Sequence, residues 1–594
     1  MKTIFTSLAL FVFSFGLVTA SETERTIPVY DLTGAITESG VVKANLLSFD
    51  TNPQLPLTHF DVVTSLQRAA ADEKIEAIVI EVDQAGFSLA QLQEIKRELE
   101  AVRSAGKEVW LYTDELNIQT ALLGSAASQF ALNPEGAVSM SGLYSESMYF
   151  KGLFDQVGVA VDVVHIGSFK SAGENFYRTG PSEAALQQST ILLDSLYHTI
   201  VTEIATGRGI TRDSLQRFVD QGVVSAQLAK SNGLVDRLQY RTDFVSALQE
   251  KYGEETVFDR EYVRNGLKVP EIDGFFDLMK LMFSSGKKKA PSEDYVGVVV
   301  FEGGIDFGSI APIRDEVLRL VDDEKCQGMV LRVNSPGGSA LASEILWEAL
   351  DEFAQTERPL VVSMGAVAAS GGYYISSGAE VIFAEPATIT GSIGVVGMKL
   401  AMGGVMEKLG ITTHEIKNGA HADLYNSTRK FSKEERRLVR RSMLDVYSTF
   451  KKRIMDGRGE RLGDDLEKLA GGRVYSGRDA LRMGLVDELG GLTDAIAKAA
   501  ELADMEKPNP LMFPKPKSAF DSLFGEDKER SNDQFISMKG AKEPGDLIAT
   551  WLQKEAVLGL LPADKQAAIS ASLRQLQAMQ SDRIQLIAPP LPCQ

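Results

Sequence analysis

The chain has 594 residues, with 62 Lys and Arg against 81 Asp and Glu, and a formal net charge of −19. An acidic chain lacks the basic face that neutralises phosphates, so we expect no nucleic-acid partner. The length exceeds what one hydrophobic core usually supports and predicts several domains. Two cysteines, Cys326 and Cys593, argue against a disulfide framework.

The first 20 residues have the features of an export signal. A short basic start precedes an uncharged apolar run at 4–19, and Val18-Thr19-Ala20 has the small-residue pattern of a signal-peptidase site. The run is short for a membrane-spanning helix. We therefore expect residues 1–20 to be a signal peptide or a short membrane anchor, and the body of the protein to be exported.

The next part of the chain alternates short apolar runs with amphipathic stretches. Strands are expected at 75–82 and 107–113, with a helix at 88–106 between them. A further strand is expected within 154–167, before a long helical region at about 182–250. This alternation predicts an α/β fold with a mostly parallel sheet.

The same order of elements then recurs, with a strand at 328–335, a helix at 339–355 and a strand at 359–364. The tetrapeptide GLVD occurs at 233–236 and again at 484–487, an offset of 251 residues. Matches in register with the same element order indicate an internal duplication.

The duplication defines the predicted domains. The first copy is expected over 21–250 and the second over 295–504, joined by a linker with an apolar patch at 251–294. Residues 505–594 are expected to form a Pro-rich linker and a helical tail that serves in docking or assembly.

A comparison of the two copies singles out one serine and one lysine. Ser370 lies among alanines and glycines, which leave a hydroxyl uncrowded, although such a stretch also suits tight packing. Its counterpart in the first copy is residue 118 or 119, and neither is a serine. Lys170 of the first copy corresponds to residues 421–422, where no lysine stands. Each half thus carries one member of a pair, which suggests a shared site.

A serine and a lysine have a known chemical use together. Serine needs a base within hydrogen-bond reach, and lysine can be that base if burial depresses its pKa until the amine is neutral. The glycine loop NSPGGS at 334–339 offers a backbone N–H to an oxyanion, and the residue after the nucleophile is the usual second donor. Gly338 and Gly371 are the predicted donors.

Four segments resemble the signal peptide peptidase SppA family, and especially its long, duplicated form, also called protease IV. They are FKSAGENF (169–176), VLRVNSPGGSALASE (330–344), VVSMGAVAASGGYYIS (361–376) and TITGSIG (388–394). The resemblance implies two tandem Clp/crotonase-like domains. It also implies that Ser370 is the nucleophile and Lys170 the general base, with Ser392 positioning the lysine amine.

These observations together predict a serine endopeptidase with a Ser–Lys dyad. By resemblance, its substrates are cleaved signal peptides and other apolar peptides on the periplasmic side of the inner membrane, where the protein is either anchored or soluble. The resemblance also implies a homo-oligomer, commonly a tetramer. The sequence shows no metal-binding spacing, and neither a metal nor another cofactor is expected. The alternatives are a crotonase-type acyl-thioester enzyme and a non-catalytic peptide-binding scaffold.

Overall fold

The computed structural model of the chain describes residues 25–34, 36–38, 57–264, 291–514, 565–566, 569–572, 575–576 and 584–589. The expected signal segment, most of the expected linker and Cys593 lie outside these residues. Within the described ranges, no helix is both long enough and apolar enough to cross a membrane.

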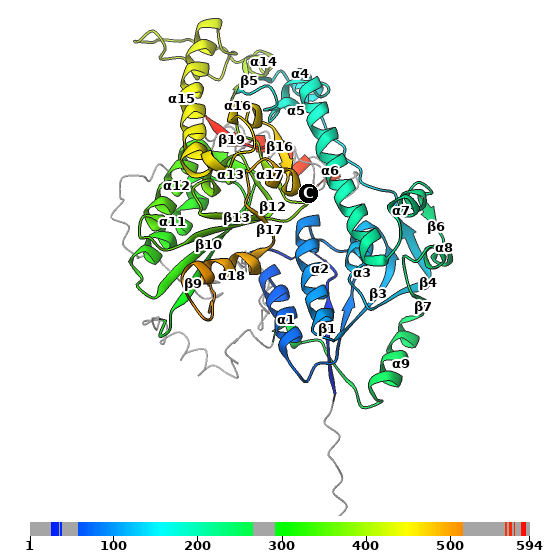
Figure 1. Cartoon of the computed structure of the whole chain (residues 1–594). Helices are drawn as coiled ribbons and strands as arrows, with labels where there is room; N and C mark the ends of the chain where they lie inside the picture. The colour runs from blue at the N-terminus through cyan, green and yellow to red at the C-terminus, as the bar shows by residue number, and fades with distance from the viewer. Residues whose placement is uncertain are drawn as a thin grey trace, which may run out of the picture.

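The first half of the chain folds around a seven-stranded sheet, drawn in colours from blue to green in Figure 1. The strand order is β6-β4-β3-β2-β1-β8, with β7 beside β4. From β4 to β8 in this order, each strand is parallel to the next one. The strands are β1 (Thr26–Asp31), β2 (Ala77–Glu81), β3 (Glu108–Leu116), β4 (Gln129–Ser139), β6 (Val223–Val224), β7 (Arg237–Leu238) and β8 (Val257–Asp259). The helices are α1 (His59–Ala71), α2 (Leu89–Ser104), α3 (Ile118–Gly124), α4 (Lys151–Val157), α5 (Glu174–Tyr177), α6 (Glu183–Arg208), α7 (Arg212–Val219), α8 (Ala226–Ser231) and α9 (Arg241–Tyr252).

The second half repeats this plan in an eight-stranded sheet of order β16-β14-β12-β10-β9-β18, with β13 beside β12 and β17 beside β13. The strands are β9 (Tyr295–Glu302), β10 (Cys326–Ser335), β12 (Leu360–Ala369), β13 (Val381–Ala384), β14 (Ile389–Gly391), β16 (Val474–Ser476), β17 (Glu488–Leu489) and β18 (Leu511–Phe513). The helices are α11 (Phe307–Asp322), α12 (Ala340–Ala354), α13 (Gly371–Ser376), α14 (Gly403–Lys408), α15 (Lys433–Arg458), α16 (Leu466–Leu469), α17 (Gly477–Arg482) and α18 (Leu492–Leu502). The α/β class and the internal duplication are confirmed.

The repeated GLVD has the same structural task in both halves. Asp236 and Asp487, its acidic residues, each accept a backbone N–H of a sheet strand, from β4 and from β13 respectively, at 2.8 Å. Each also pairs with an arginine at the end of the long helix of its half, Arg208 in α6 and Arg458 in α15. The motif therefore ties the long helix to the sheet, since a carboxylate between a guanidinium and an amide forms charge-assisted hydrogen bonds.

A third, four-stranded sheet joins the two halves. Its order is β11 (Gly337–Ser339), β19 (Gln585–Ile587), β15 (Val395–Ala401) and β5 (Ala160–Ile166). The strand expected within 154–167 is therefore present, but it pairs with the second half rather than with its own sheet. Two strands, β18 and β19, lie in the region expected to be a linker and a helical tail, and β8 lies in the expected interdomain linker.

Buried charges also connect the halves. Arg332 of β10 is 1% exposed and donates to Glu38 at 3.0 Å and to Glu94 of α2 at 2.9 Å. His59 of α1 lies 2.8 Å from the same Glu94 carboxylate. Although burial acts to raise the pKa of Glu94, Arg332 and His59 hold it well below its ordinary value. The Glu94 carboxylate therefore stays charged beside the Arg332 guanidinium.

We expect Arg332→Met to destabilise the protein by about 3–5 kcal/mol at pH 7, because it leaves buried carboxylates without a cation. The midpoint of thermal unfolding measures the loss. Arg437→Met, on an arginine with 73% of its side chain exposed, is the matched control and should stay within about 0.5 kcal/mol of wild type. Equal midpoints for the two variants would show that the cluster does not hold the halves together.

Candidate active site

The pairing of β5 with β15 brings a loop of the first half to the second half. The two strands are antiparallel over seven residue pairs, from Ala160 opposite Ala401 to Ile166 opposite Val395. Lys170 follows the end of β5 by four residues, and Ser392 precedes the start of β15 by three. Because the register fixes which ends of the strands meet, it sets these two residues side by side.

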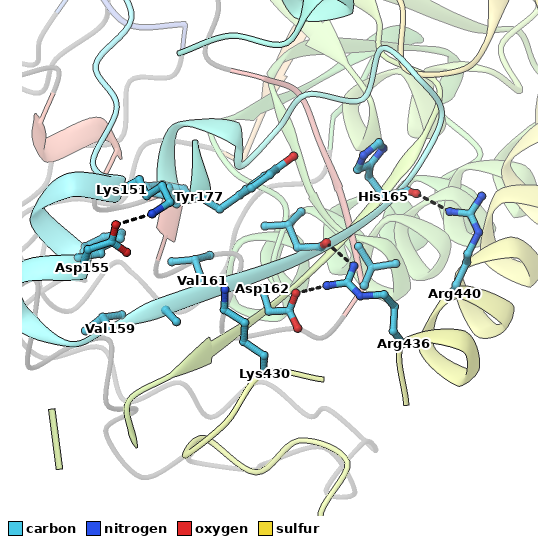
Figure 2. A pocket seen from close by; sticks show the side chains of 15 residues that line it. Lys151, Asp155, Val159, Val161, Asp162, His165, Tyr177, Lys430, Arg436 and Arg440 are labelled. Atoms are coloured by element: carbon cyan, nitrogen blue, oxygen red, sulfur yellow. Dashed lines mark hydrogen bonds and ion pairs between the residues drawn. The ribbon is translucent and has the colours of Figure 1, made fainter. Parts of the chain in front are cut away.

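Strand β5 is also held along its other side by helix α15 of the second half, as Figure 2 shows. Arg436 donates to the carbonyl of Val163 at 2.9 Å and forms an ion pair with Asp162. Arg440, one turn further along the helix, donates to the carbonyl of His165 at 3.0 Å. Hydrogen bonds to backbone carbonyls fix the strand itself, so the position of the Lys170 loop depends on both neighbours of β5.

Ser370 occupies the sharp turn between β12 and α13. Its φ of +57° is in the region that non-glycine residues rarely adopt, and its backbone N–H donates to Gly391 at 2.7 Å. The side chain makes no capping hydrogen bond to α13, which leaves the hydroxyl available for another partner. The two glycines after it permit close packing, since a Cβ at Gly372 would stand 2.6 Å from the carbonyl oxygen of Ser335.

The lysine of the first half meets the serines of the second half. Lys170 Nζ lies 2.7 Å from Ser370 Oγ, 2.7 Å from the carbonyl oxygen of Ser392 and 3.0 Å from Ser392 Oγ. All three residues are at most 1% exposed, and in the part of the chain described Lys170 forms no ion pair with a carboxylate. Burial alone lowers the pKa of the Lys170 amine well below its ordinary value. The amine is thus suited to accept a proton.

The two glycines predicted as oxyanion donors lie on adjacent segments. Gly338 is in β11, directly after Gly337, whose φ is +97°. A Cβ on Gly337 would stand 2.7 Å from the backbone nitrogen of Gly371, so the glycine loop runs against the start of α13. A side chain at Gly338 is excluded as well, because its Cβ would be 2.1 Å from the carbonyl oxygen of Ile305. The structure therefore brings together all five residues that the sequence singled out.

The sequence did not single out Gly471 and Gly472, which support the lysine loop. The carbonyl of Gly471 accepts the N–H of Phe169 at 2.9 Å, and Gly472 donates to the carbonyl of Ile393 at 2.8 Å. A Cβ on Gly472 would stand 2.3 Å from the backbone nitrogen of Lys170. The Gly-Gly dipeptide is the signal that could have marked this position, as adjacent glycines often permit a close backbone approach.

The position equivalent to Ser370 in the first half is one residue earlier than the sequence comparison placed it. Asn117 follows β3 and precedes α3, as Ser370 follows β12 and precedes α13. The Asn117 side chain accepts the backbone N–H groups of Gln119 and Thr120 and caps the helix. A small insertion between the copies explains the shift, and the first half still has no serine at this turn.

Comparisons with known proteins agree with the repeated architecture. The model of peptidase family S49 matches residues 101–254 and 352–506. The chain is 31% identical to protease 4 of Salmonella typhi, over 82% of this chain and 80% of that protein. It is 30% identical to protease 4 of Haemophilus influenzae, over 76% of this chain and 74% of that protein. It is also 30% identical to the chloroplastic serine protease SPPA of Arabidopsis thaliana, over 74% of this chain but only 64% of that protein.

The buried amine predicts an unusual effect of pH on stability. Between the lowered pKa of folded Lys170 and the ordinary value of 10.5, the unfolded chain binds a proton that the folded chain does not. Stability therefore rises with pH in this window, by up to about 1.4 kcal/mol per pH unit. Because the Lys170→Met variant lacks the amine, we expect its free energy of unfolding to lose this dependence on pH. The variant should therefore exceed wild type in stability by the largest amount at the acid end of this pH range.

Chemical denaturation of both proteins across pH 7–10 measures the difference. Lys452→Met, on a lysine with 66% of its side chain exposed, serves as the control and should follow the wild-type curve. A constant difference between Lys170→Met and wild type at every pH would mean that the Lys170 amine is charged in the folded protein.

Proposed function

The chain belongs to peptidase family S49 and is a serine peptidase, and we propose that Ser370 is its nucleophile and Lys170 its general base. The observation that carries this proposal is the distance of 2.7 Å between Lys170 Nζ and Ser370 Oγ in a fully buried site. A hydroxyl and a base at that distance meet the geometric requirement for proton transfer. The lowered pKa of Lys170 meets the chemical requirement, because it favours the neutral amine that can accept the proton.

The hydrogen bonds around the amine suit this role. A neutral amine has two N–H groups and one lone pair. The carbonyl and hydroxyl oxygens of Ser392 accept the two N–H groups, and the lone pair then receives the Ser370 hydroxyl. Ser392 is in this proposal a positioning residue, which turns the lone pair toward Ser370.

The proposed reaction has two steps. Ser370 Oγ attacks the peptide carbonyl carbon while Lys170 takes its proton, and the N–H groups of Gly338 and Gly371 stabilise the oxyanion. The C–N bond then breaks, the proton passes from Lys170 to the leaving amine, and an acyl-enzyme remains. Water activated by Lys170 hydrolyses the ester and frees Ser370.

The substrates we propose are released signal peptides and other extended apolar peptides. The export signal expected at residues 1–20 and the likeness to bacterial protease 4 support a place in the cell envelope, on the periplasmic side of the inner membrane. We further propose a homo-oligomer, of which the tetramer is the form implied by the family resemblance. Membrane association belongs to the same proposal.

Labelling with a fluorophosphonate tests the nucleophile. We expect wild type to be labelled and Ser370→Ala to lose labelling completely, because the probe forms its bond with an activated serine hydroxyl. Ser376→Ala is the matched control, since Ser376 is also fully buried on α13, but its hydroxyl donates to the carbonyl of Gly372. Equal labelling of wild type and Ser370→Ala would exclude Ser370 as nucleophile.

A second test addresses the base. Lys170→Ala should lower kcat/KM for an apolar peptide by about 10⁴-fold with the fold retained, because the hydroxyl loses its proton acceptor. Lys170→Arg should not restore activity, since a guanidinium stays protonated. For wild type, kcat/KM should rise with pH through the lowered pKa of Lys170, well below 10.5. Activity retained in Lys170→Ala would assign the base to another group.

A further inference from the structure

We propose that the outer edge of strand β5 is a second peptide-binding site, which takes an extended acidic segment of another molecule by strand addition. The site is a cavity of about 450 Å³, seen from close by in Figure 2. Its walls are β5, the helices α4 and α5 of the first half, and helix α15 of the second half with the residue Lys430 before it. Neither Ser370 nor Lys170 is among the residues that line the cavity. The site is therefore separate from the Ser370 chemistry.

Strand β5 has an edge that pairs with no other strand in the described ranges. It is the last strand of the four-stranded sheet, and β15 is its strand neighbour there. The carbonyls of Val163 and His165 point away from β15, since they accept N–H groups of Arg436 at 2.9 Å and of Arg440 at 3.0 Å. In an extended strand the N–H and C=O groups of one residue point to the same side. The N–H groups of Val163 and His165 therefore point to the free edge as well.

These two N–H groups have no acceptor among the residues that the structure describes. A strand edge with unpaired donors is a template for the backbone of another chain. Val163 and His165 are two residues apart, which is the repeat at which an added strand offers its own carbonyls. Their carbonyls each keep a second lone pair beside the arginine donor. The edge can thus bind an extended peptide through its backbone.

The cavity is positively charged, although the formal net charge of the chain is −19. The charged side chains that line it are four cations and two carboxylates: Lys151, Lys430, Arg436, Arg440, Asp155 and Asp162. Asp155 pairs with Lys151, and Asp162 pairs with Arg436. Within the described ranges Lys430 and Arg440 have no carboxylate partner. An occupant with carboxylates would balance these two charges, so the cavity fits an acidic peptide.

The two sides of the cavity differ in polarity, which predicts the residue pattern of the occupant. Phe154 of α4 and Phe176 of α5 belong to the apolar cluster that also contains Val161 of β5. Lys430 and Arg440 lie on the side of α15. Successive side chains of a strand point to opposite faces. An added strand would place every second residue against the aromatic rings and the others beside the cations. The matching sequence therefore alternates apolar and acidic residues.

Arg436 and Arg440 also determine which peptides the edge accepts. Charged side chains on an edge strand are a common protection against indiscriminate pairing. A neutral or basic strand would remove water from the two guanidinium groups without supplying a counter-charge, which is costly. A strand with carboxylates would instead form charge-assisted hydrogen bonds with them. The same two arginines thus exclude most peptides and select acidic ones.

A labelled peptide tests the site on the full-length protein. The probe is fluorescein-labelled Val-Asp-Val-Asp-Val-Asp amide, and its Kd is measured by fluorescence anisotropy in the Ser370→Ala background, which prevents cleavage. We expect Arg440→Met to weaken binding by about tenfold and Lys430→Met by about threefold, because each removes a charge-assisted contact. Lys430→Met keeps the hydrogen bonds between α15 and β5, so its loss of affinity does not come from a displaced strand. Arg437→Met, on the same helix but outside the cavity, is the matched control and should keep the Kd.

Backbone-modified probes separate strand addition from general attraction of anions. One probe is N-methylated at every valine and the other at every aspartate, with the charge unchanged. Because alternate N–H groups of an added strand face β5, we expect one of the two probes to bind at least about tenfold more weakly than the parent, and the other to bind like it.

Equal binding of the parent and both methylated probes would overturn the inference, and so would displacement of the parent by sodium phosphate as effectively as by unlabelled peptide. Displacement by Val-Ala-Val-Ala-Val-Ala amide would place the probe in the catalytic groove and would also overturn it. None of these measurements requires hydrolysis. A failure here therefore leaves the proposed peptidase function standing, and absence of Ser370-dependent hydrolysis would contradict that function alone.

Discussion

The site depends on one lysine amine that is buried without a counter-charge. In a medium of low polarity an isolated ammonium is so costly that the group gives up its proton instead. Lys170 is in this condition because its loop comes from the first half, while the groups that cover it come from the second. Neither half could bury the amine by itself. The low pKa is therefore a property of the docked pair of halves, and anything that separates them would raise the pKa of Lys170 toward its ordinary value.

The contacts that keep the halves docked include buried groups that, unlike Lys170, have partners of opposite charge. Arg332 and Glu94 are as buried as Lys170, but they remain charged because each has a partner of opposite sign within 3.0 Å. Similar burial thus lowers the pKa of an amine in one place and is compatible with an ion pair in another, and the presence of a partner decides which. The cluster and the β5–β15 pairing join the halves at different positions, so the lysine loop is held at a fixed distance from Ser370.

Much of this arrangement could be predicted from the sequence, and the reasons for the exceptions are physical. The parallel strands, the duplication and the residues of the site were recognisable because apolar periodicity and motif spacing are local properties. Strand pairing is not local, so nothing in residues 160–166 showed that this strand would leave its own sheet. Strand β19 is three residues long, which is too short for a periodic signal. The acidic partners of Arg332 come from segments more than 200 residues away.

The two copies of the strand-to-helix turn show where the fold bears a conformational cost. In the first half Asn117 has an ordinary extended backbone, with φ of −126°, and its side chain caps α3. In the second half Ser370 has φ of +57° and makes no capping bond. A positive φ at a non-glycine residue and a missing cap each cost stability, commonly about 1 kcal/mol or more. The fold can thus form this turn with an ordinary extended backbone, as it does at Asn117. The unfavourable positive φ is found in the copy whose serine contacts Lys170. This departure from the ordinary backbone frees the hydroxyl from the helix end and directs it to the other half.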